Sequence, residues 1–187
     1  MDKGMRLVQL AHNHVSEVVN QGDFCLDATA GNGHDSLFLA QQVGMRGKVF
    51  SIDIQAQAIQ KTKILLQQNG LHGVVQLILG SHSNLLELVD KTTHGQIKAS
   101  TFNLGYLPGG DHSVITHADN TTHAICQAYQ ITALGGIISV LCYRGHVGGT
   151  EEAYSVAELC EHRRWSYEKI NGSENPTSPV LMLIRKT

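Results

Sequence analysis

DATAGNGHD, residues 27–35, lies between a short apolar run at 24–26 and a helical pattern that begins at Ser36. This order predicts a buried strand, a glycine-containing turn and a helix. Gly31 and Gly33 allow a sharp turn and leave room for a ligand, because glycine has no Cβ. The helix that follows directs its free N–H groups and the positive end of its dipole at whatever binds in the turn.

A second acidic residue, Asp53, closes the next apolar run at 49–52. A carboxylate at the end of the second strand, roughly 20 residues beyond the loop, is positioned to bind ribose hydroxyls. The loop departs from the G-x-G-x-x-G pattern of dinucleotide sites and begins with an acid, Asp27. That carboxylate would repel a pyrophosphate, so the loop favours a cationic or zwitterionic ligand with an amino group. A plain strand–turn–helix connection in another α/β fold is the alternative interpretation.

This loop, together with Asp53, resembles the S-adenosylmethionine (SAM) loop of class I methyltransferases. Hydrophobic periodicity predicts strands that alternate with helices along the chain. The predicted strands span residues 24–26, 48–53, 74–79, 98–104, 137–143, 165–170 and 180–185, and the helices span 3–20, 55–69, 116–133 and 151–163, with further helices beginning at Ser36 and near Ser81. The last two strands have no helix between them, so they form an antiparallel hairpin. We therefore expect an α/β fold of the class I methyltransferase, Rossmann-like type: a seven-stranded, mostly parallel sheet with one antiparallel strand and helices on both faces.

Chain length, composition, net charge and cysteine count limit the classes of protein to which this chain can belong. The chain has 187 residues, 42% hydrophobic and 16% charged, which predicts one globular domain over 1–187 with an N-terminal helix. Its net charge of -2 argues against a strongly electrostatic nucleic-acid binder, although a local basic face can coexist with a neutral total. No membrane-length apolar run or signal-peptide pattern is present, so we expect a cytoplasmic protein without a membrane partner. The four cysteines form no CxxC pair and no zinc-site spacing occurs, so we expect buried thiols and no metal.

Asn103-Leu104-Gly105-Tyr106 follows the fourth predicted strand and resembles the Asn-Pro-Pro-Tyr loop of methyltransferases that act on amino groups. Methyl transfer needs a nitrogen lone pair aimed along the methyl–sulfur axis, so acceptors on the enzyme must hold the N–H groups. The Asn103 side-chain oxygen and the Leu104 carbonyl can do this, and Tyr106 can stack on a base. This loop lacks both prolines, and an Asn cap with a core Tyr is the alternative interpretation.

Four runs carry a narrower resemblance over essentially the full length: DATAGNGHDSLFLA (27–40), FNLGYLPGGDH (102–112), YRGHVGGTEE (143–152) and NPTSP (175–179). They resemble the small bacterial rRNA methylase family, whose members are now assigned as tRNA methyltransferases. These convert the wobble uridine 5-aminomethyl-2-thiouridine to its 5-methylaminomethyl form. The resemblance implies SAM as cofactor, S-adenosylhomocysteine (SAH) as product and the anticodon stem-loop of tRNA as partner, with a homodimer as one possible assembly. Arg144 and Ser36 depart from the residues expected at their positions.

The strand ends and the resemblance together predict the site. The predicted cofactor-binding residues are Asp27, Thr29, Gly31, Asn32, Gly33, Asp35, Asp53, Gln55, Ser81, His82 and Asn103. An alkylamine has a pKa of about 10, so the site must bind or generate its neutral form. Asp111, His112 and His146 are candidates to take the proton, and they complete the predicted catalytic set with Asn103 and Tyr106; solvent is the alternative acceptor. Tyr106, Tyr143 and Arg144 are the predicted substrate contacts.

Three rival functions remain open from the sequence. The chain could methylate an rRNA base, or a small-molecule amine or hydroxyl, which its size and weak net charge favour. It could also be a SAM-binding module without catalysis. Asn103 and Tyr106 argue against that last alternative.

Overall fold

The computed structural model describes residues 3–105 and 116–187. Its strands are β1 (Phe24–Asp27), β2 (Lys48–Asp53), β3 (Val75–Leu79), β4 (Ile97–Leu104), β5 (Thr132–Cys142), β6 (Ser166–Asn171) and β7 (Val180–Arg185). They form one sheet in the order β3-β2-β1-β4-β5-β7-β6. Among the strands of the described residues, only β7 runs against its neighbours, pairing antiparallel with both β5 and β6. The order reverses between β1 and β4, which is where open α/β sheets bind ligands at their carboxyl edge.

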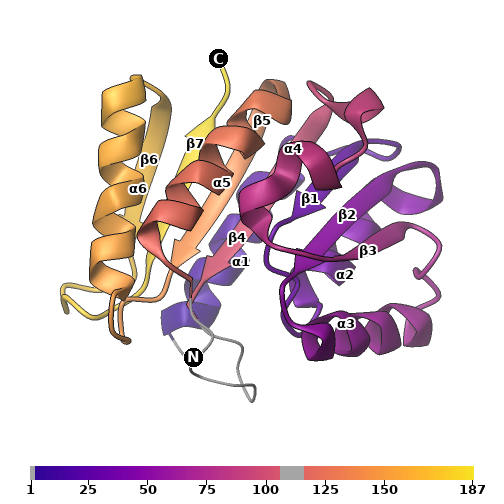
Figure 1. Ribbon diagram of the computed structural model, residues 1–187, viewed down its shortest axis with the longest axis horizontal. Helices are drawn as coiled ribbons and strands as arrows, with labels where there is room; N and C mark the ends of the chain where they lie inside the picture. The colour runs from indigo at the N-terminus through magenta and orange to yellow at the C-terminus, as the bar shows by residue number, and fades with distance from the viewer. Residues whose placement is uncertain (1–2, 106–115) are drawn as a thin grey trace.

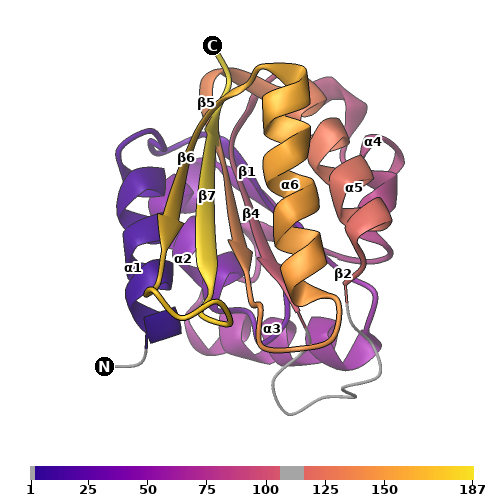
Figure 2. The same ribbon diagram turned by 90° about the vertical axis from the view of Figure 1, so that its left-hand side faces the viewer.

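Helices cover both faces of the sheet (Figures 1 and 2). They are α1 (Lys3–Ser16), α2 (His34–Val43), α3 (Ala56–Gln68), α4 (Leu85–Leu88), α5 (Ala118–Ile131) and α6 (Gly149–Arg163), with 3-10 turns η1 (Gly44–Arg46), η2 (His82–Asn84) and η3 (Lys91–Thr93). The first three helices lie on one face, and α4, α5 and α6 lie on the other. A parallel sheet needs this double cover, because its strands are apolar on both sides.

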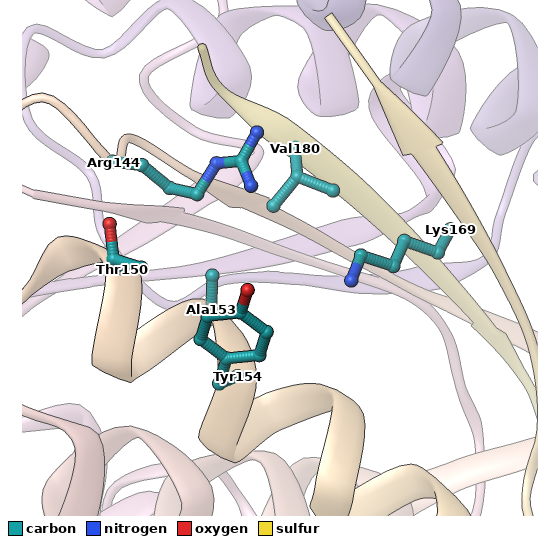
Figure 3. Close-up of a pocket in the computed structure, with 6 residues that line it drawn as sticks. All are labelled: Arg144, Thr150, Ala153, Tyr154, Lys169 and Val180. Carbon is teal, nitrogen blue, oxygen red and sulfur yellow. The ribbon is translucent and has the colours of Figure 1, made fainter. Parts of the chain in front are cut away.

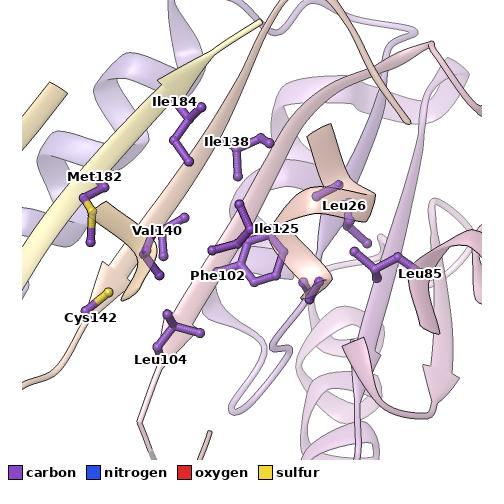
Figure 4. Close-up of a cluster of buried hydrophobic side chains, with 14 of the residues drawn as sticks. Leu26, Leu85, Phe102, Leu104, Ile125, Ile138, Val140, Cys142, Met182 and Ile184 are labelled. Atoms are coloured by element: carbon purple, nitrogen blue, oxygen red, sulfur yellow. The ribbon is translucent and has the colours of Figure 1, made fainter. Parts of the chain in front are cut away.

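Two hydrophobic cores result, one on each face of the sheet. Successive strand residues point to opposite faces, so neighbours belong to different cores. Val49 packs toward α1, α2 and α3, whereas Phe50 belongs to the core beneath α4, α5 and α6. Figure 4 shows the second core, in which Phe102 of β4 lies near the side chain of Ile125 from α5. These cores hold the carboxyl ends of the central strands in place.

The predicted architecture is confirmed: seven strands, a single antiparallel strand and helices on both faces. Several predicted boundaries are wrong. The first helix ends at Ser16 rather than at residue 20, and α5 begins at Ala118 rather than 116. Strand β5 begins at Thr132 rather than at residue 137, because Thr132 already pairs with Ile97 of β4. A bulge that includes Gly135, at φ 71°, follows before the regular pairing resumes at Ile137. The helix near Ser81 is a 3-10 turn followed by the single-turn α4.

Three further features concern the classes of protein considered above. Among the described residues, no helix is long and apolar enough to cross a membrane. Within the same residues, no group of three His, Cys, Asp or Glu side chains is arranged to hold a metal ion. Cys25, Cys142 and Cys160 are buried free thiols, as predicted, and Cys126 is partly exposed.

Candidate active site

The glycine loop between β1 and α2 lies at the carboxyl edge of the sheet. Gly31 and Gly33 adopt φ values of 55° and 85°, in the left-handed region that favours glycine. A Cβ on Gly33 would lie 2.9 Å from the Cα of Thr62 on α3, so a side chain has no room there. The Ala30 N–H donates to the Ile52 carbonyl at 2.9 Å, which ties the turn to β2. Glycine is therefore required at both positions by the backbone angle, and at Gly33 also by the close packing of α3.

Asp53, at the end of β2, connects the loop to the next helix. One carboxylate oxygen accepts from the Gly31 N–H at 2.9 Å, and the other accepts from the Gln55 N–H at 2.8 Å. Gln55 itself is the N-cap residue of α3. Because each carboxylate oxygen has two acceptor sites, Asp53 retains capacity for ribose hydroxyls. This geometry agrees with the predicted place of Asp53 beside the ligand.

Asp27 lies behind the loop and is completely buried. Its carboxylate accepts from the Ser36 hydroxyl at 2.6 Å and from the Thr29 N–H at 3.2 Å. Ser36 is also 2.5 Å from the Ser51 hydroxyl, which explains why a small hydroxyl residue is accommodated at that position. Because its oxygens are held by its own turn and helix, the predicted direct contact of Asp27 with the cofactor stays a prediction. We assign Asp27 the role of positioning the loop.

Burial raises the pKa of Asp27 from 3.8 to about 7, with further contributions from the nearby charges of Asp35 and Asp53. The folded protein then holds the Asp27 proton more tightly than the unfolded chain does. This contribution to stability is fully present below the unfolded pKa and is lost as the pH rises through the folded pKa. We therefore expect the free energy of unfolding of the wild type to fall, relative to that of Asp27→Asn, between about pH 4 and about pH 7.

Urea denaturation of both proteins at several pH values measures this difference, because Asn keeps an acceptor for Ser36 but does not titrate in this range. Parallel stability curves for the two proteins would contradict the assignment of the shifted pKa to Asp27.

A hydrogen-bond network joins the loop, α2 and β4. The Asn103 backbone N–H donates to the Thr29 hydroxyl at 2.7 Å, and the Asn103 side-chain amide donates to one oxygen of Asp35 at 2.5 Å. His12 of α1 lies 2.6 Å from the other oxygen of Asp35. The structure thus brings three predicted site residues, Thr29, Asp35 and Asn103, into direct contact. His12 is not among the predicted site residues, because its spacing on α1 favours a solvent-exposed side chain and gives no sign of this partner.

The turn after β3 carries two further predicted cofactor-binding residues, Ser81 and His82. Ser81 is the N-cap residue of η2, as expected, and its hydroxyl accepts from the Ser83 N–H at 3.2 Å. The His82 ring lies edge-on to Phe102, with ring centroids 6.2 Å apart. Burial lowers the pKa of His82, while the Ala28 backbone and the charge of Asp53 oppose that shift. His82 therefore presents a largely buried, neutral ring near the loop, suited to packing.

The predicted substrate side is described only in part. Tyr106, Asp111 and His112 lie outside the described residues. A Cβ on Gly105 would lie 3.5 Å from the His146 ring and 3.5 Å from the Tyr143 Cβ, so both residues lie beside the end of β4. The Leu104 carbonyl accepts from the Tyr143 N–H at 3.0 Å. That carbonyl therefore takes part in strand pairing, and its second lone pair leaves the predicted contact with the acceptor amine untested.

Glu152 in the first turn of α6 is a second residue that sequence analysis missed. It is 1% exposed, yet both of its oxygens are satisfied. One accepts from the Thr116 hydroxyl at 2.7 Å and the other from the Thr121 hydroxyl at 2.5 Å. Because the Thr116 N–H also donates to the Gly105 carbonyl at 3.1 Å, Glu152 connects α6 to the end of β4 through Thr116.

Arg144 lines a small basic cleft between α6 and the β6–β7 hairpin (Figure 3). The residues around it are Arg144, Thr150, Ala153, Tyr154, Lys169 and Val180. The Arg144 and Lys169 side chains extend toward each other from opposite sides, and the Tyr154 hydroxyl points into the space between them. The Arg144 Nε donates to the Ser178 carbonyl at 2.6 Å, and Lys169 Nζ lies 5.7 Å from the centroid of the Tyr154 ring. Arg144 is thus anchored beside the site rather than extended into solvent.

The donors and charges around the glycine loop fit SAM. Asp27, Asp35 and Asp53 place three carboxylates around one turn, and the charges of the last two raise the pKa of the first. A ligand with a sulfonium and an ammonium group complements this negative potential, whereas a pyrophosphate would not. The positive-φ glycines leave the backbone open to a close approach. Asp53, beside the same turn, keeps the acceptor capacity that the predicted ribose contact requires.

Comparisons with known proteins agree with this arrangement. The family model described as "Putative rRNA methylase" matches residues 49–186. A chloroplastic tRNA (mnm(5)s(2)U34)-methyltransferase from Arabidopsis thaliana is 35% identical over 192 residues, which cover 97% of this chain and 69% of that protein. The crystal structure of a protein from Clostridium thermocellum described as a "putative rRNA-methylase" is 36% identical, with a TM-score of 0.89 over 96% of this chain and 97% of that one.

A further structure shows such a protein with the product of methyl transfer. It is a methyltransferase from Streptococcus mutans in complex with SAH, 31% identical, with a TM-score of 0.81 over 96% of this chain and 97% of that one. The family match covers well over half of the sequence, and the relatives align over nearly all of it. The chain belongs to this rRNA methylase family and is a SAM-dependent methyltransferase of the class I fold.

Proposed function

We propose that the chain methylates the 5-aminomethyl nitrogen of the wobble uridine in tRNA. The observation that carries this proposal is the placement of Asn103, at the end of β4 and bonded to both Thr29 and Asp35. An acceptor amide beside a SAM loop suits an amine nucleophile. The Arabidopsis thaliana relative, whose name specifies this uridine, supports the choice of substrate.

The chain's residues act mainly by orientation in this proposal. SAM, when bound, supplies the electrophilic methyl group and leaves as SAH. The Asn103 side-chain nitrogen already donates to Asp35, so its oxygen is turned to the other side and can accept an N–H of the substrate amine. Holding that N–H directs the nitrogen lone pair along the methyl–sulfur axis. His146, beside Gly105, is the predicted proton acceptor within the described residues; Asp111 and His112 remain predicted alternatives.

The basic cleft gives the proposed RNA substrate a place to dock. Arg144 follows β5 and Val180 begins β7, so the cleft opens at the same carboxyl edge as Asn103. Within the described part of the chain, no ion pair within 4.0 Å involves Arg144 or Lys169. The space between the side chains is too narrow to hold a water molecule, so Arg144 and Lys169 would contact a backbone phosphate at the rim of the cleft, with Tyr154 available to donate its hydroxyl. Local positive charge here is compatible with the net charge of -2.

The test uses purified protein, labelled SAM and tRNA that carries 5-aminomethyl-2-thiouridine at the wobble position. We expect label in the tRNA and 5-methylaminomethyl-2-thiouridine after digestion and mass spectrometry. Parallel reactions with rRNA and with a mixture of small amines separate the rival substrates. Label in either of those, with none in tRNA, would overturn the proposal while leaving SAM-dependent methyl transfer intact.

Lys169→Ala tests the docking cleft. We expect weaker tRNA binding and a salt dependence, plotted as log K against log salt, that is shallower by about one, because one phosphate contact is lost. SAM affinity should stay at the wild-type value. Lys63→Ala is the matched control, since Lys63 is an exposed lysine on α3, on the other face of the sheet. Equal salt slopes in wild type and Lys169→Ala would remove Lys169 from the interface.

A further inference from the structure

His12 connects the N-terminal helix to the candidate active site. Leu7, Ala11 and Val15 form the buried stripe of α1, and His12 stands beside that stripe. Its ring stacks on Phe38 of α2, with centroids 3.8 Å apart and planes within 5° of parallel. The stacking holds the imidazole plane in place, and only 17% of the side chain is exposed. A histidine that merely faces solvent would have neither contact.

Asp35 lies between His12 and Asn103 and bonds to both. One carboxylate oxygen is 2.6 Å from His12 Nε2, and the other accepts from the Asn103 side chain at 2.5 Å. The Asp35 side chain is 12% exposed. A carboxylate only accepts hydrogen bonds, so His12 presents a protonated Nε2 and Asn103 presents its amide nitrogen. The two donors together fix the rotation of the Asp35 carboxylate.

The fixed Asp35 carboxylate determines the orientation of the Asn103 side chain. Its backbone is held by Thr29, so the remaining freedom is rotation of the side-chain amide. The hydrogen bond to Asp35 fixes that rotation only while the Asp35 carboxylate is itself held in place. The hydrogen bond from His12 to the other carboxylate oxygen holds it. We propose that His12, acting through Asp35, is a positioning residue that keeps the Asn103 oxygen directed at the acceptor amine. This inference rests on the proposed function of Asn103 and extends it to a residue on α1.

Two substitutions separate the parts of the His12 side chain. His12→Phe keeps an aromatic ring to stack on Phe38 but removes the N–H donor. His12→Gln removes the ring but offers an amide N–H at a similar distance along the side chain. We expect His12→Phe to lower kcat by about 10-fold to 100-fold, in the range that small displacements of positioned groups produce. His12→Gln should recover most of that loss, and SAM affinity should change little in either variant.

A second readout does not depend on the substrate. In protein with selectively ¹⁵N-labelled asparagine, the Asn103 side-chain amide protons give a signal that Asn103→Ala identifies by its disappearance. We expect these protons to exchange with water slowly in the wild type and in His12→Gln, and several-fold faster in His12→Phe. The circular dichroism spectra of all three proteins should coincide, because the buried stripe of α1 is unchanged.

The outcomes distinguish this inference from the proposed function. A wild-type protein that does not methylate the tRNA overturns the function, and the amide exchange rates still test the link from His12 to Asn103. A wild-type kcat in His12→Phe overturns the positioning role. Equal loss in His12→Phe and His12→Gln also overturns it, because the imidazole itself would then be required, as for a proton acceptor. Unchanged amide exchange in His12→Phe contradicts the structural link directly.

Discussion

Asn103→Ala is expected to lower kcat and kcat/KM together by about 100-fold or more, the scale for losing one oriented polar group from an excluded site. The loss should appear in kcat because the Asn103 oxygen holds the amine in its reactive orientation, which matters most in the transition state. SAM affinity should remain close to that of the wild type. The Thr29 hydroxyl bonds to the Asn103 backbone, which alanine retains.

Steady-state kinetics on tRNA with the 5-aminomethyl uridine, together with calorimetric titration of SAM, measure both quantities. Asn69→Ala is a suitable control, because Asn69 is an exposed asparagine at the end of α3. A variant at Asn103 that keeps the wild-type kcat would refute the proposed role. The acceptor amine would then have to be held by residues nearer His146.

The fold could be predicted almost completely, because its signals are local and repeated. Short continuous apolar runs predict buried strands such as β2, and the absence of a predicted helix between β6 and β7 predicts the antiparallel pair. The wrong boundary of β5 lies where strand pairing in the sheet outweighs the local sequence pattern. Gly135 and Gly136 predict a break between the helix at 116–133 and the strand at 137–143. In the structure they lie inside β5 as a bulge, because β4 pairs with Thr132 before them and with Ile137 after them.

The site could be predicted only where residues lie at strand ends. Asp53 and Asn103 are predicted in this way, since topology alone brings the ends of β2 and β4 to one edge. His12 was missed because its contact with Asp35 joins residues 23 apart and depends on how α1 packs on the sheet. Glu152 was missed for the same reason: an acid in the first turn of a helix normally faces water. The complete burial of Asp27 is likewise a property of packing, which the sequence pattern does not give.

Asp53→Ala is expected to weaken SAM binding by about 10-fold to 150-fold, which corresponds to losing about 1.5–3 kcal/mol from hydrogen bonds to a charged group. The effect has two sources. The variant loses the acceptors proposed for the ribose hydroxyls, and it also releases the Gly31 and Gln55 N–H groups that Asp53 now holds. Asp53→Asn is the intermediate case between these two sources of the loss, because its amide keeps one acceptor oxygen and loses the other. We therefore expect Asp53→Asn to bind SAM with an affinity between those of wild type and Asp53→Ala.

Isothermal titration of SAM into each variant measures the change in Kd. Asp90→Ala is the matched control, because it removes one exposed carboxylate that caps η3, a 3-10 turn that lies before β4 rather than at its carboxyl end. It should leave the Kd at the wild-type value, which separates a specific contact from the effect of net charge. Wild-type affinity in Asp53→Ala would remove Asp53 from the cofactor site. Because the glycine loop depends on the same carboxylate, a loss of affinity without any change in thermal stability would identify the ribose contact as the larger source.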